Sequence, residues 1–146
     1  MALSDAALEG STTVRPTVTG VHHFSITVRD LEVSIPWYEQ VFALTKVMDE
    51  PHEGGHAVVL LHPESMLFFG LHAHDANRGE SFAETRTGLD HISFGVSTRA
   101  ELEAWMTRFD QLGVTYSPIA DVSYGSVLVF RDPDNIQLEL IAPIAS

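Results

Sequence analysis

Two histidines and one glutamate carry the clearest chemical signal in this sequence. His23 lies in the segment VHHFSITV, and His91 lies in the similar segment LDHISFGV in the second half of the chain. Glu139 stands between Leu138 and Leu140 near the C-terminal end. Neutral imidazoles together with a carboxylate suit Fe(II), Mn, Co, Ni or Zn, and three protein ligands leave coordination positions open for a substrate. These residues therefore predict a catalytic divalent-metal site.

The two histidine segments belong to similar halves of the chain, which is why the histidines are expected to meet. In residues 19–28 polar side chains alternate with apolar ones, as in a β-strand with two distinct faces: His23, Ser25 and Thr27 against Phe24, Ile26 and Val28. Residues 89–96 predict a second such strand. If two duplicated halves pack about a pseudo-twofold axis, equivalent positions face one shared cleft.

Each half is predicted to have the order β-α-β-β-β. Apolar residues at three- and four-residue spacing indicate a helix that begins at Asp30 or Ser34 and ends near residue 44. A second helix is expected over residues 99–112, capped by Ser97 or Thr98 and stopped by Gly113. The expected strands are residues 19–28, 45–49, 56–62 and 66–72, then 89–96, 114–117, 126–130 and 136–141.

Length and composition predict one domain. A chain of 146 residues with 45% hydrophobic content can bury one sizeable core. We expect a flexible polar arm at residues 1–16 and a single domain at 17–146. Its first module is expected at residues 17–74, a connection at 75–87, and the second module at 88–144.

Charge and cysteine content exclude several classes of function. The formal net charge of −12 argues against nucleic acid or an anionic membrane as a partner, because both are bound through clustered cations. Residues 1–16 contain neither a basic start followed by an apolar run nor a span near the roughly 20 apolar residues that a membrane helix needs. The sequence also has no cysteine, so His, Asp and Glu are the strong metal donors, and a reducing, cytoplasmic location fits.

Each candidate ligand also has an ordinary structural explanation. A single histidine in a strand is usually a hydrogen-bonded core or surface residue, and Glu139 could point to solvent. The joint placement of the three residues in a duplicated frame favours the metal site.

Several motifs make the chain resemble the vicinal oxygen chelate superfamily. They are His23 followed by VRDL, the helix segment SIPWY at residues 34–38, GLDH ending at His91, and DPDNIQLEL at residues 132–140. The superfamily includes glyoxalase I, extradiol ring-cleaving dioxygenases, fosfomycin-resistance enzymes and bleomycin-resistance proteins. The resemblance covers residues 17–143. It implies an α+β fold of two tandem βαβββ modules that form a cupped, partly open mixed sheet around a central metal cleft.

The resemblance assigns the metal ligands as His23, His91 and Glu139. Glyoxalase I has a fourth ligand, a glutamate, at a position where this chain has Gly70, which cannot ligate. His72 or His74 could substitute for it. Without a fourth ligand the set matches extradiol dioxygenases and fosfomycin-resistance enzymes, with Fe(II) or Mn favoured and Zn, Ni or Co also compatible.

The resemblance further implies an enzyme acting on a small molecule with vicinal oxygens, leaning towards dioxygenase-like chemistry. The alternatives are a glyoxalase-like lyase or isomerase, an antibiotic-modifying transferase, or a non-catalytic drug- or ligand-binding protein. A homodimer is expected, with modules paired within a chain or swapped between two.

Other residues are expected around the site. Tyr124 is a candidate proton donor or acceptor, although a solvent-exposed rim tyrosine is the competing interpretation. His22 should point away from the site because neighbouring strand residues face opposite sides. The expected pocket walls are partly apolar: Val47, Val58, Leu60, Phe94 and Val127.

Overall fold

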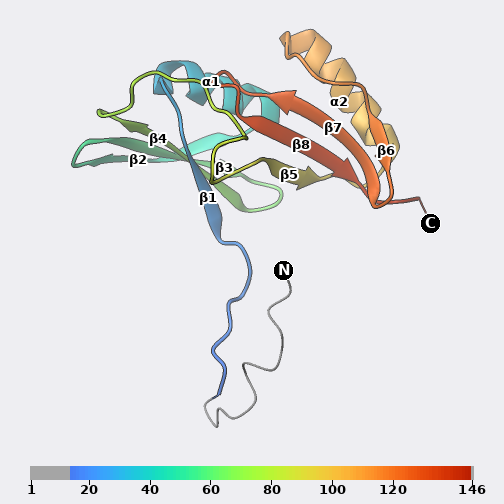
Figure 1. Ribbon diagram of the computed structural model, residues 1–146, viewed down its shortest axis with the longest axis horizontal. Helices are drawn as coiled ribbons and strands as arrows, with labels where there is room; N and C mark the ends of the chain where they lie inside the picture. The colour runs from blue at the N-terminus through green and yellow to red at the C-terminus, as the bar shows by residue number, and fades with distance from the viewer. Residues whose placement is uncertain (1–13, 146) are drawn as a thin grey trace.

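The computed structural model describes residues 14–145 and contains two βαβββ modules (Figure 1). The first consists of β1 (His23–Thr27), α1 (Leu31–Phe42), β2 (Thr45–His52), β3 (Gly55–His62) and β4 (Leu67–His74). The second consists of β5 (Ile92–Gly95), α2 (Arg99–Leu112), β6 (Ala120–Val122), β7 (Gly125–Arg131) and β8 (Gln137–Ala142). This arrangement confirms the predicted α+β fold. Most of the arm expected at residues 1–16 lies outside the described residues.

Both modules have the same sheet topology. The strand orders are β1-β4-β3-β2 and β5-β8-β7-β6, and the sheets are open. In each module the first strand runs parallel to the last one, while the other neighbours are antiparallel. The internal repeat in the sequence therefore corresponds to a repeat of the same four-stranded unit.

The structure shows which of the predicted capping residues cap the two helices. The Asp30 side chain accepts a hydrogen bond from the Glu32 backbone N–H, so Asp30 caps α1, whereas Ser34 is buried inside the helix. Thr98 caps α2 in the same way. Gly113 ends α2 with φ 69, a left-handed conformation that glycine adopts without steric cost.

One predicted strand is wrong. Residues 114–117 form no regular strand, and Tyr116 makes only an isolated bridge to Phe130. The strand at the edge of the second sheet is instead β6, which pairs with the start of β7. The Ser117 backbone N–H still donates to the Val129 carbonyl at 2.9 Å, and the contact stops at Pro118, which has no N–H to contribute to a strand ladder.

A single hydrophobic core connects the two modules. Phe42 on α1 packs against Phe69 of its own sheet, and also against Phe94 of β5 and Phe130 of β7, with ring centres 4.9–6.1 Å apart. On the other side Phe109 of α2 packs on Phe130 at 4.5 Å. The core lies on the helix-bearing face of each sheet, so the opposite faces of both sheets stay outside it.

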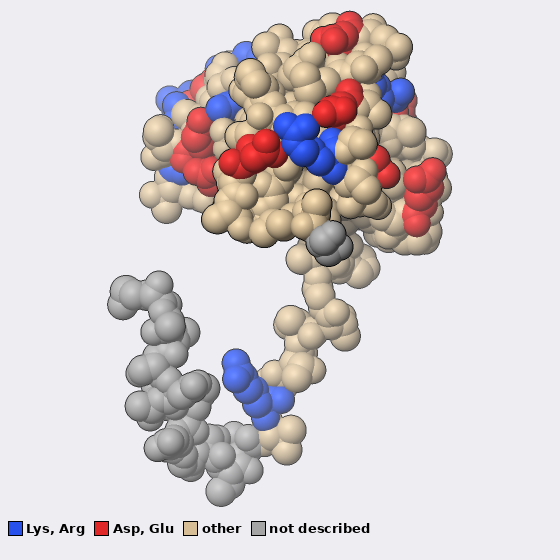
Figure 2. Space-filling model, turned by 90° about the vertical axis from the view of Figure 1, so that its right-hand side faces the viewer, with Lys and Arg blue, Asp and Glu red and all other residues tan. Residues whose placement is uncertain are grey.

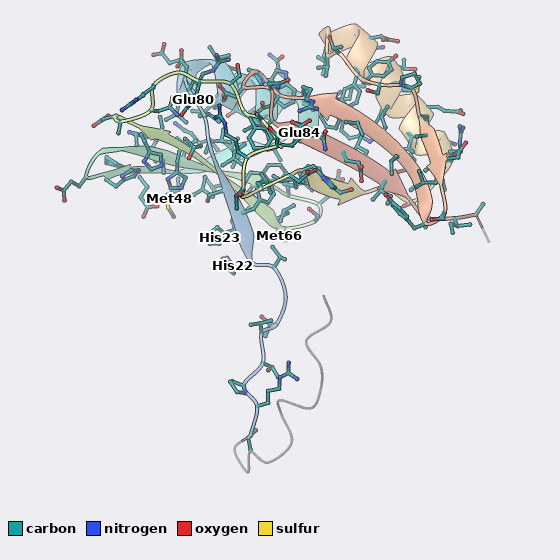
Figure 3. The ribbon with its side chains drawn as sticks, viewed as in Figure 1. His22, His23, Met48, Met66, Glu80 and Glu84 are labelled. Carbon is teal, nitrogen blue, oxygen red and sulfur yellow. The ribbon has the colours of Figure 1, made fainter. Side chains whose placement is uncertain are left out.

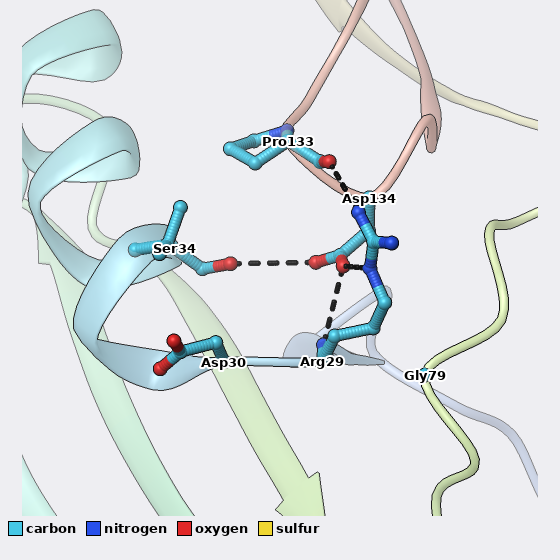
Figure 4. A pocket seen from close by; sticks show the side chains of 7 residues that line it. Arg29, Asp30, Ser34, Gly79, Pro133 and Asp134 are labelled. Atoms are coloured by element: carbon cyan, nitrogen blue, oxygen red, sulfur yellow. Dashed lines mark hydrogen bonds and ion pairs between the residues drawn. The ribbon is translucent and has the colours of Figure 1, made fainter.

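The turn between β7 and β8 locks this arrangement by docking on the start of α1 (Figure 4). Arg29 Nε donates to Asp134 Oδ1 at 2.6 Å, and Ser34 Oγ donates to Asp134 Oδ2 at 3.4 Å. Deeper in the core, Tyr38 Oη donates to Asp132 Oδ2 at 2.8 Å. We call this set of residues (29, 34, 38, 132 and 134) the intermodule latch. It connects the modules through buried carboxylates.

The surface carries charges of both signs. On the face shown in Figure 2, basic and acidic groups lie close together among wide uncharged areas. Arg99 on α2, for example, is paired with Asp121 at 2.9 Å and Glu103 at 3.0 Å. Among the described residues on that face there is no broad positive surface of the kind that holds a phosphate backbone. Neither of the helices in the described part of the chain is long and apolar enough to cross a membrane.

The latch predicts that removing the Tyr38 hydroxyl group destabilises the fold. Tyr38→Phe should lower the free energy of unfolding by about 1–2 kcal/mol, because Asp132 loses a buried hydrogen-bond donor. Chemical denaturation measures this difference. Tyr124→Phe is the matched control, since that side chain is 65% exposed and its loss should leave stability nearly unchanged. Equal stabilities of the two variants would contradict the role given to the latch.

The latch also predicts a pH dependence. Burial raises the pKa of Asp132 from 3.8 to about 6, with a smaller contribution from the neighbouring charge of Asp134, and this outweighs the hydrogen bonds that favour the carboxylate. A raised pKa stabilises the fold below about pH 4, and this contribution is lost as the pH rises through about 6.

Compared with Asp132→Asn, which does not titrate, the wild type should therefore lose about 2–3 kcal/mol of unfolding free energy between about pH 4 and pH 7. Denaturation curves at several pH values test this. Asp75→Asn, which removes an exposed carboxylate, should follow the wild-type curve.

Candidate functional site

The second module places Glu139 on the face of its sheet that the core does not use. Leu138 and Leu140 are buried at 0% and 2% exposure, and strand alternation turns Glu139 to the opposite side. There its register partner on β5 is Ser93, whose Oγ donates to Glu139 Oε1 at 2.7 Å. Glu139 is therefore neither a core residue nor a free surface residue, but an oriented carboxylate.

His91 lies immediately before β5, two residues ahead of Ser93. Its Nδ1 is 2.7 Å from Asp90 Oδ1, and a carboxylate only accepts hydrogen bonds, so the imidazole proton is on Nδ1. Gln137 Nε2 donates to the same Asp90 oxygen at 3.3 Å. The lone pair of His91 Nε2 is left available for a metal ion, in the way that a carboxylate partner orients metal-binding histidines.

The first module repeats this geometry with one change. Ser25 on β1 pairs with Gly70 on β4, as Ser93 pairs with Glu139. The register thus confirms that Gly70 stands where the first module's carboxylate would be. A Cβ added to Gly70 would lie 2.2 Å from Ser25 Oγ, so the serine hydroxyl occupies the space of the missing side chain.

His23 borders a cavity of about 470 Å³ on the exposed face of the first sheet. In Figure 3 His22, His23 and Met48 lie on the side of this sheet away from α1. The cavity has mostly apolar walls with polar groups among them, and its lining includes His22, His23, Ser25, Val47, Met48, Glu50, Ala57, Val59, Phe68, Gly70 and His72. Its size and lining suit a small molecule.

Several residues that were expected in the walls of this cavity lie in the core instead. Val58 and Leu60 were expected to line the pocket, but both are buried in the core, and the alternate residues Ala57 and Val59 line it. Val127 is likewise buried. Phe94 packs against Phe69 between the modules and lines a second cavity, of about 410 Å³, together with Ser93. Val47 does line the cavity beside His23 as expected.

His22 does not point away from His23. It lies before β1 begins, so strand alternation does not apply to it. Its Nδ1 lies 2.9 Å from His23 Nδ1, its ring stacks on Phe68, and both histidines line the cavity.

One chain does not bring the three predicted ligands together. Among residues 14–145 there is no group of three or more His, Cys, Asp or Glu side chains arranged to hold a metal ion. The predicted ligands instead lie in two separate places, which we call the half-sites of the predicted metal centre. One contains His23, and the other contains His91 and Glu139.

The remaining predicted residues lie farther away. Tyr124 is in the turn between β6 and β7 and is 65% exposed. His72 pairs with Thr27, four residues along β1 from His23, and its ring neighbours are His52 and His74. Sequence reasoning overlooked Ser93 and Asp90, although the two-residue step from His91 to Ser93 was a usable signal for the serine.

The sequence belongs to a known family. The Glyoxalase/Bleomycin resistance protein/Dioxygenase superfamily matches residues 20–140, and the chain is a member of it. A glyoxylase/bleomycin resistance protein/dioxygenase domain from Frankia sp. EAN1pec has a similar structure, with 33% sequence identity and a TM-score of 0.81 over 87% of this chain and 99% of that one.

Two further proteins resemble this chain more distantly. A mutant of the fosfomycin resistance protein FosX from Listeria monocytogenes, complexed with Mn(II) and 1S,2S-dihydroxypropylphosphonic acid, shares the fold at 20% identity and a TM-score of 0.64, over 86% of this chain and 93% of that one. A Bacillus subtilis (strain 168) protein named "Putative ring-cleaving dioxygenase MhqA" is 27% identical over 118 residues, which are 75% of this chain. The match spans only 37% of that protein's length.

The paired serines predict different effects on metal binding. Ser93→Ala should weaken the binding of Mn²⁺ by roughly tenfold, because Glu139 loses the hydrogen bond that orients it. Ser25→Ala removes the equivalent serine of the first module, which faces Gly70 and no carboxylate, and should bind Mn²⁺ as the wild type does. Titration calorimetry of both variants measures the difference. Equal affinities would contradict the orienting role of Ser93.

Proposed function

We propose that this protein is a divalent-metal-dependent enzyme that acts on a small substrate with two neighbouring oxygens. The observation that carries the proposal is the oriented pair His91 and Glu139, with its supporting residues Asp90 and Ser93. His23 is the third ligand. The donor set of two imidazoles and one carboxylate fits Fe(II) or Mn, and also Zn, Ni or Co.

The metal centre is formed between two chains of a homodimer. Both half-sites lie outside the core that joins the two modules, on faces that one chain leaves open. Within the described part of one chain no complete ligand group exists. A partner related by twofold symmetry would supply His23 to the His91 and Glu139 of the other chain, and the reverse, which gives two equivalent sites.

Bound at such a site, the ion would polarise the two substrate oxygens as a Lewis acid. The chain's own residues have defined tasks. Asp90 holds His91 in its ligating tautomer, and Ser93 fixes Glu139. The apolar walls beside His23 receive the organic part of the substrate and exclude water from it. Tyr124 is a candidate proton donor, which a closing partner chain would have to bring to the substrate.

Among the reactions of the superfamily we favour dioxygenase-like chemistry on a small aromatic diol. Two observations support this choice. Gly70 removes the fourth ligand position, so that an ion with three protein ligands keeps open positions for both substrate and dioxygen. The distant similarity to the Bacillus subtilis protein named for ring cleavage points in the same direction. The lack of cysteine fits a reducing cytoplasm as the place of action.

Mixing two inactive variants tests the shared site. Neither His23→Ala nor Glu139→Gln should bind stoichiometric Mn²⁺ alone. After unfolding and refolding together, about a quarter of the sites should bind again, because half of the dimers are mixed and each of these has one intact site. Titration calorimetry counts the sites. If the wild type binds the ion but mixing restores nothing, the shared site is wrong.

The reaction is tested with an oxygen electrode on Fe(II)-loaded protein and a panel of substituted catechols, whose two oxygens are neighbours. Oxygen uptake that is lost in His91→Ala supports ring cleavage. Turnover of hemithioacetals or of fosfomycin without oxygen uptake would instead indicate lyase or transferase chemistry. Ligand binding that is unchanged by His91→Ala, with no bound metal in the wild type, would indicate a binding protein and overturn the enzyme proposal.

A further inference from the structure

A second group of histidines lies at the far end of the first sheet. Two rows of register partners cross β2, β3 and β4 there. One row is Glu50, Ala57 and His72, and the next is His52, Gly55 and His74. Partners across a sheet point to the same side, and residues two apart on a strand do so as well. Four polar side chains therefore surround a floor made of alanine and glycine.

The small residues in the middle are needed for this arrangement. A Cβ added to Gly55 would lie 2.8 Å from His52 Cε1 and 2.2 Å from the backbone oxygen of Ala73. The His52 ring thus extends over Gly55 towards β4. Any larger residue at this position would hold the rings of His52 and His74 apart.

The three imidazole rings form a nearly equilateral triangle. Their centres are 5.7 Å apart for His52 and His72, 5.6 Å for His52 and His74, and 5.9 Å for His72 and His74. The point equidistant from these centres lies about 3.3 Å from each, and an ion bound by imidazole nitrogen lies roughly 3.2 Å from the ring centre. The triangle therefore has the size that one ion requires.

The electrostatics of the cluster favour a neutral imidazole at His72. Burial lowers the pKa of His72, and the neighbouring His52 and His74 lower it further, whereas Glu50 raises it. Glu50 and His52 act on His72 from β2, and His74 acts on it from β4. A neutral ring has a free lone pair for a metal, and Glu50 offers a negative charge beside it.

We propose that His52, His72 and His74, with Glu50 nearby, form a second metal site for a late first-row divalent ion such as Zn²⁺ or Ni²⁺. The ring planes of His72 and His74 are now almost parallel, at 17°, so their nitrogens do not yet converge, in keeping with the lack of a ready-made ligand group in the described chain. The nitrogens can be brought together by rotation about the side-chain torsions of these histidines. Such rotations are fast in exposed or half-buried residues.

This site lies beside the half-site at His23 without coinciding with it, although His72 and Glu50 also line the cavity that His23 borders. The register partner of His23 on β4 is Phe68, and His72 lies four residues further along the strand, a separation of roughly 13 Å. One ion cannot bridge it. His72 and His74 are thus better placed to bind an ion of their own than to replace the carboxylate missing at Gly70.

The experiment uses full-length protein from which any polyhistidine tag has been removed, in the double variant His91→Ala/Glu139→Gln. This background removes two ligands of the proposed catalytic centre. The result therefore tests the second site whether or not the proposed catalytic centre exists. Calorimetric titration with Zn²⁺ alone should show one ion per chain. His74→Asn or His52→Asn added to this background should weaken the binding at least roughly tenfold. Lowering the pH from about 7.5 to about 5.5 should weaken it as well, because protons compete for the imidazoles.

His56→Asn is the matched control. His56 is a neighbouring exposed histidine on β3 whose ring contacts Asp49 at 3.2 Å, and it faces the other side of the sheet from Gly55. Its loss should leave Zn²⁺ binding unchanged, and thermal unfolding without metal verifies that each variant is folded. The proposal is overturned if the background variant binds no stoichiometric Zn²⁺, or if His52→Asn, His72→Asn and His74→Asn all bind it as tightly as His56→Asn does.

Discussion

The burial of two carboxylates from the second module against the first helix is the constraint on which the rest of the molecule depends. Asp132 and Asp134 are only 6% and 5% exposed, and groups of this kind are costly to bury without partners. Their side-chain partners, Arg29, Ser34 and Tyr38, all come from the other module. The modules cannot separate or rotate without leaving a buried acid unpaired. This fixes which sheet faces are covered and which remain open.

Most of the fold could be predicted because local signals and the repeat agree. The alternation of His23 to Val28, the cap at Thr98 and the stop at Gly113 each correspond to an observed feature. The strand expected at residues 114–117 failed, since the hydrophobic pattern there did not take account of Pro118. Side-chain direction was predicted less well. A shift of one residue placed Val58 and Leu60 in the pocket, although both belong to the core.

The sequence indicated the residues of the candidate site but not where they lie relative to one another. Equivalent positions in a duplicated sequence suggested that His23 and His91 meet, yet the sequence contains no signal for whether modules pair within a chain or between chains. In the described chain the intermodule latch, whose contacts join residues about 100 positions apart, holds the two modules together. From the sequence, His72 and His74 were candidates only for the missing fourth ligand, because only the strand register shows that they face His52 across Gly55 and Ala57.

The pairing of Ser25 with Gly70 has a consequence for how the two modules can diverge. In the second module a serine and a glutamate share the same two register positions, whereas in the first module the serine hydroxyl occupies the space where a side chain at Gly70 would begin. Restoring a carboxylate at Gly70 would thus require a rearrangement at Ser25 as well. A single substitution at Gly70 would therefore not reproduce in the first module the serine and carboxylate pair of the second.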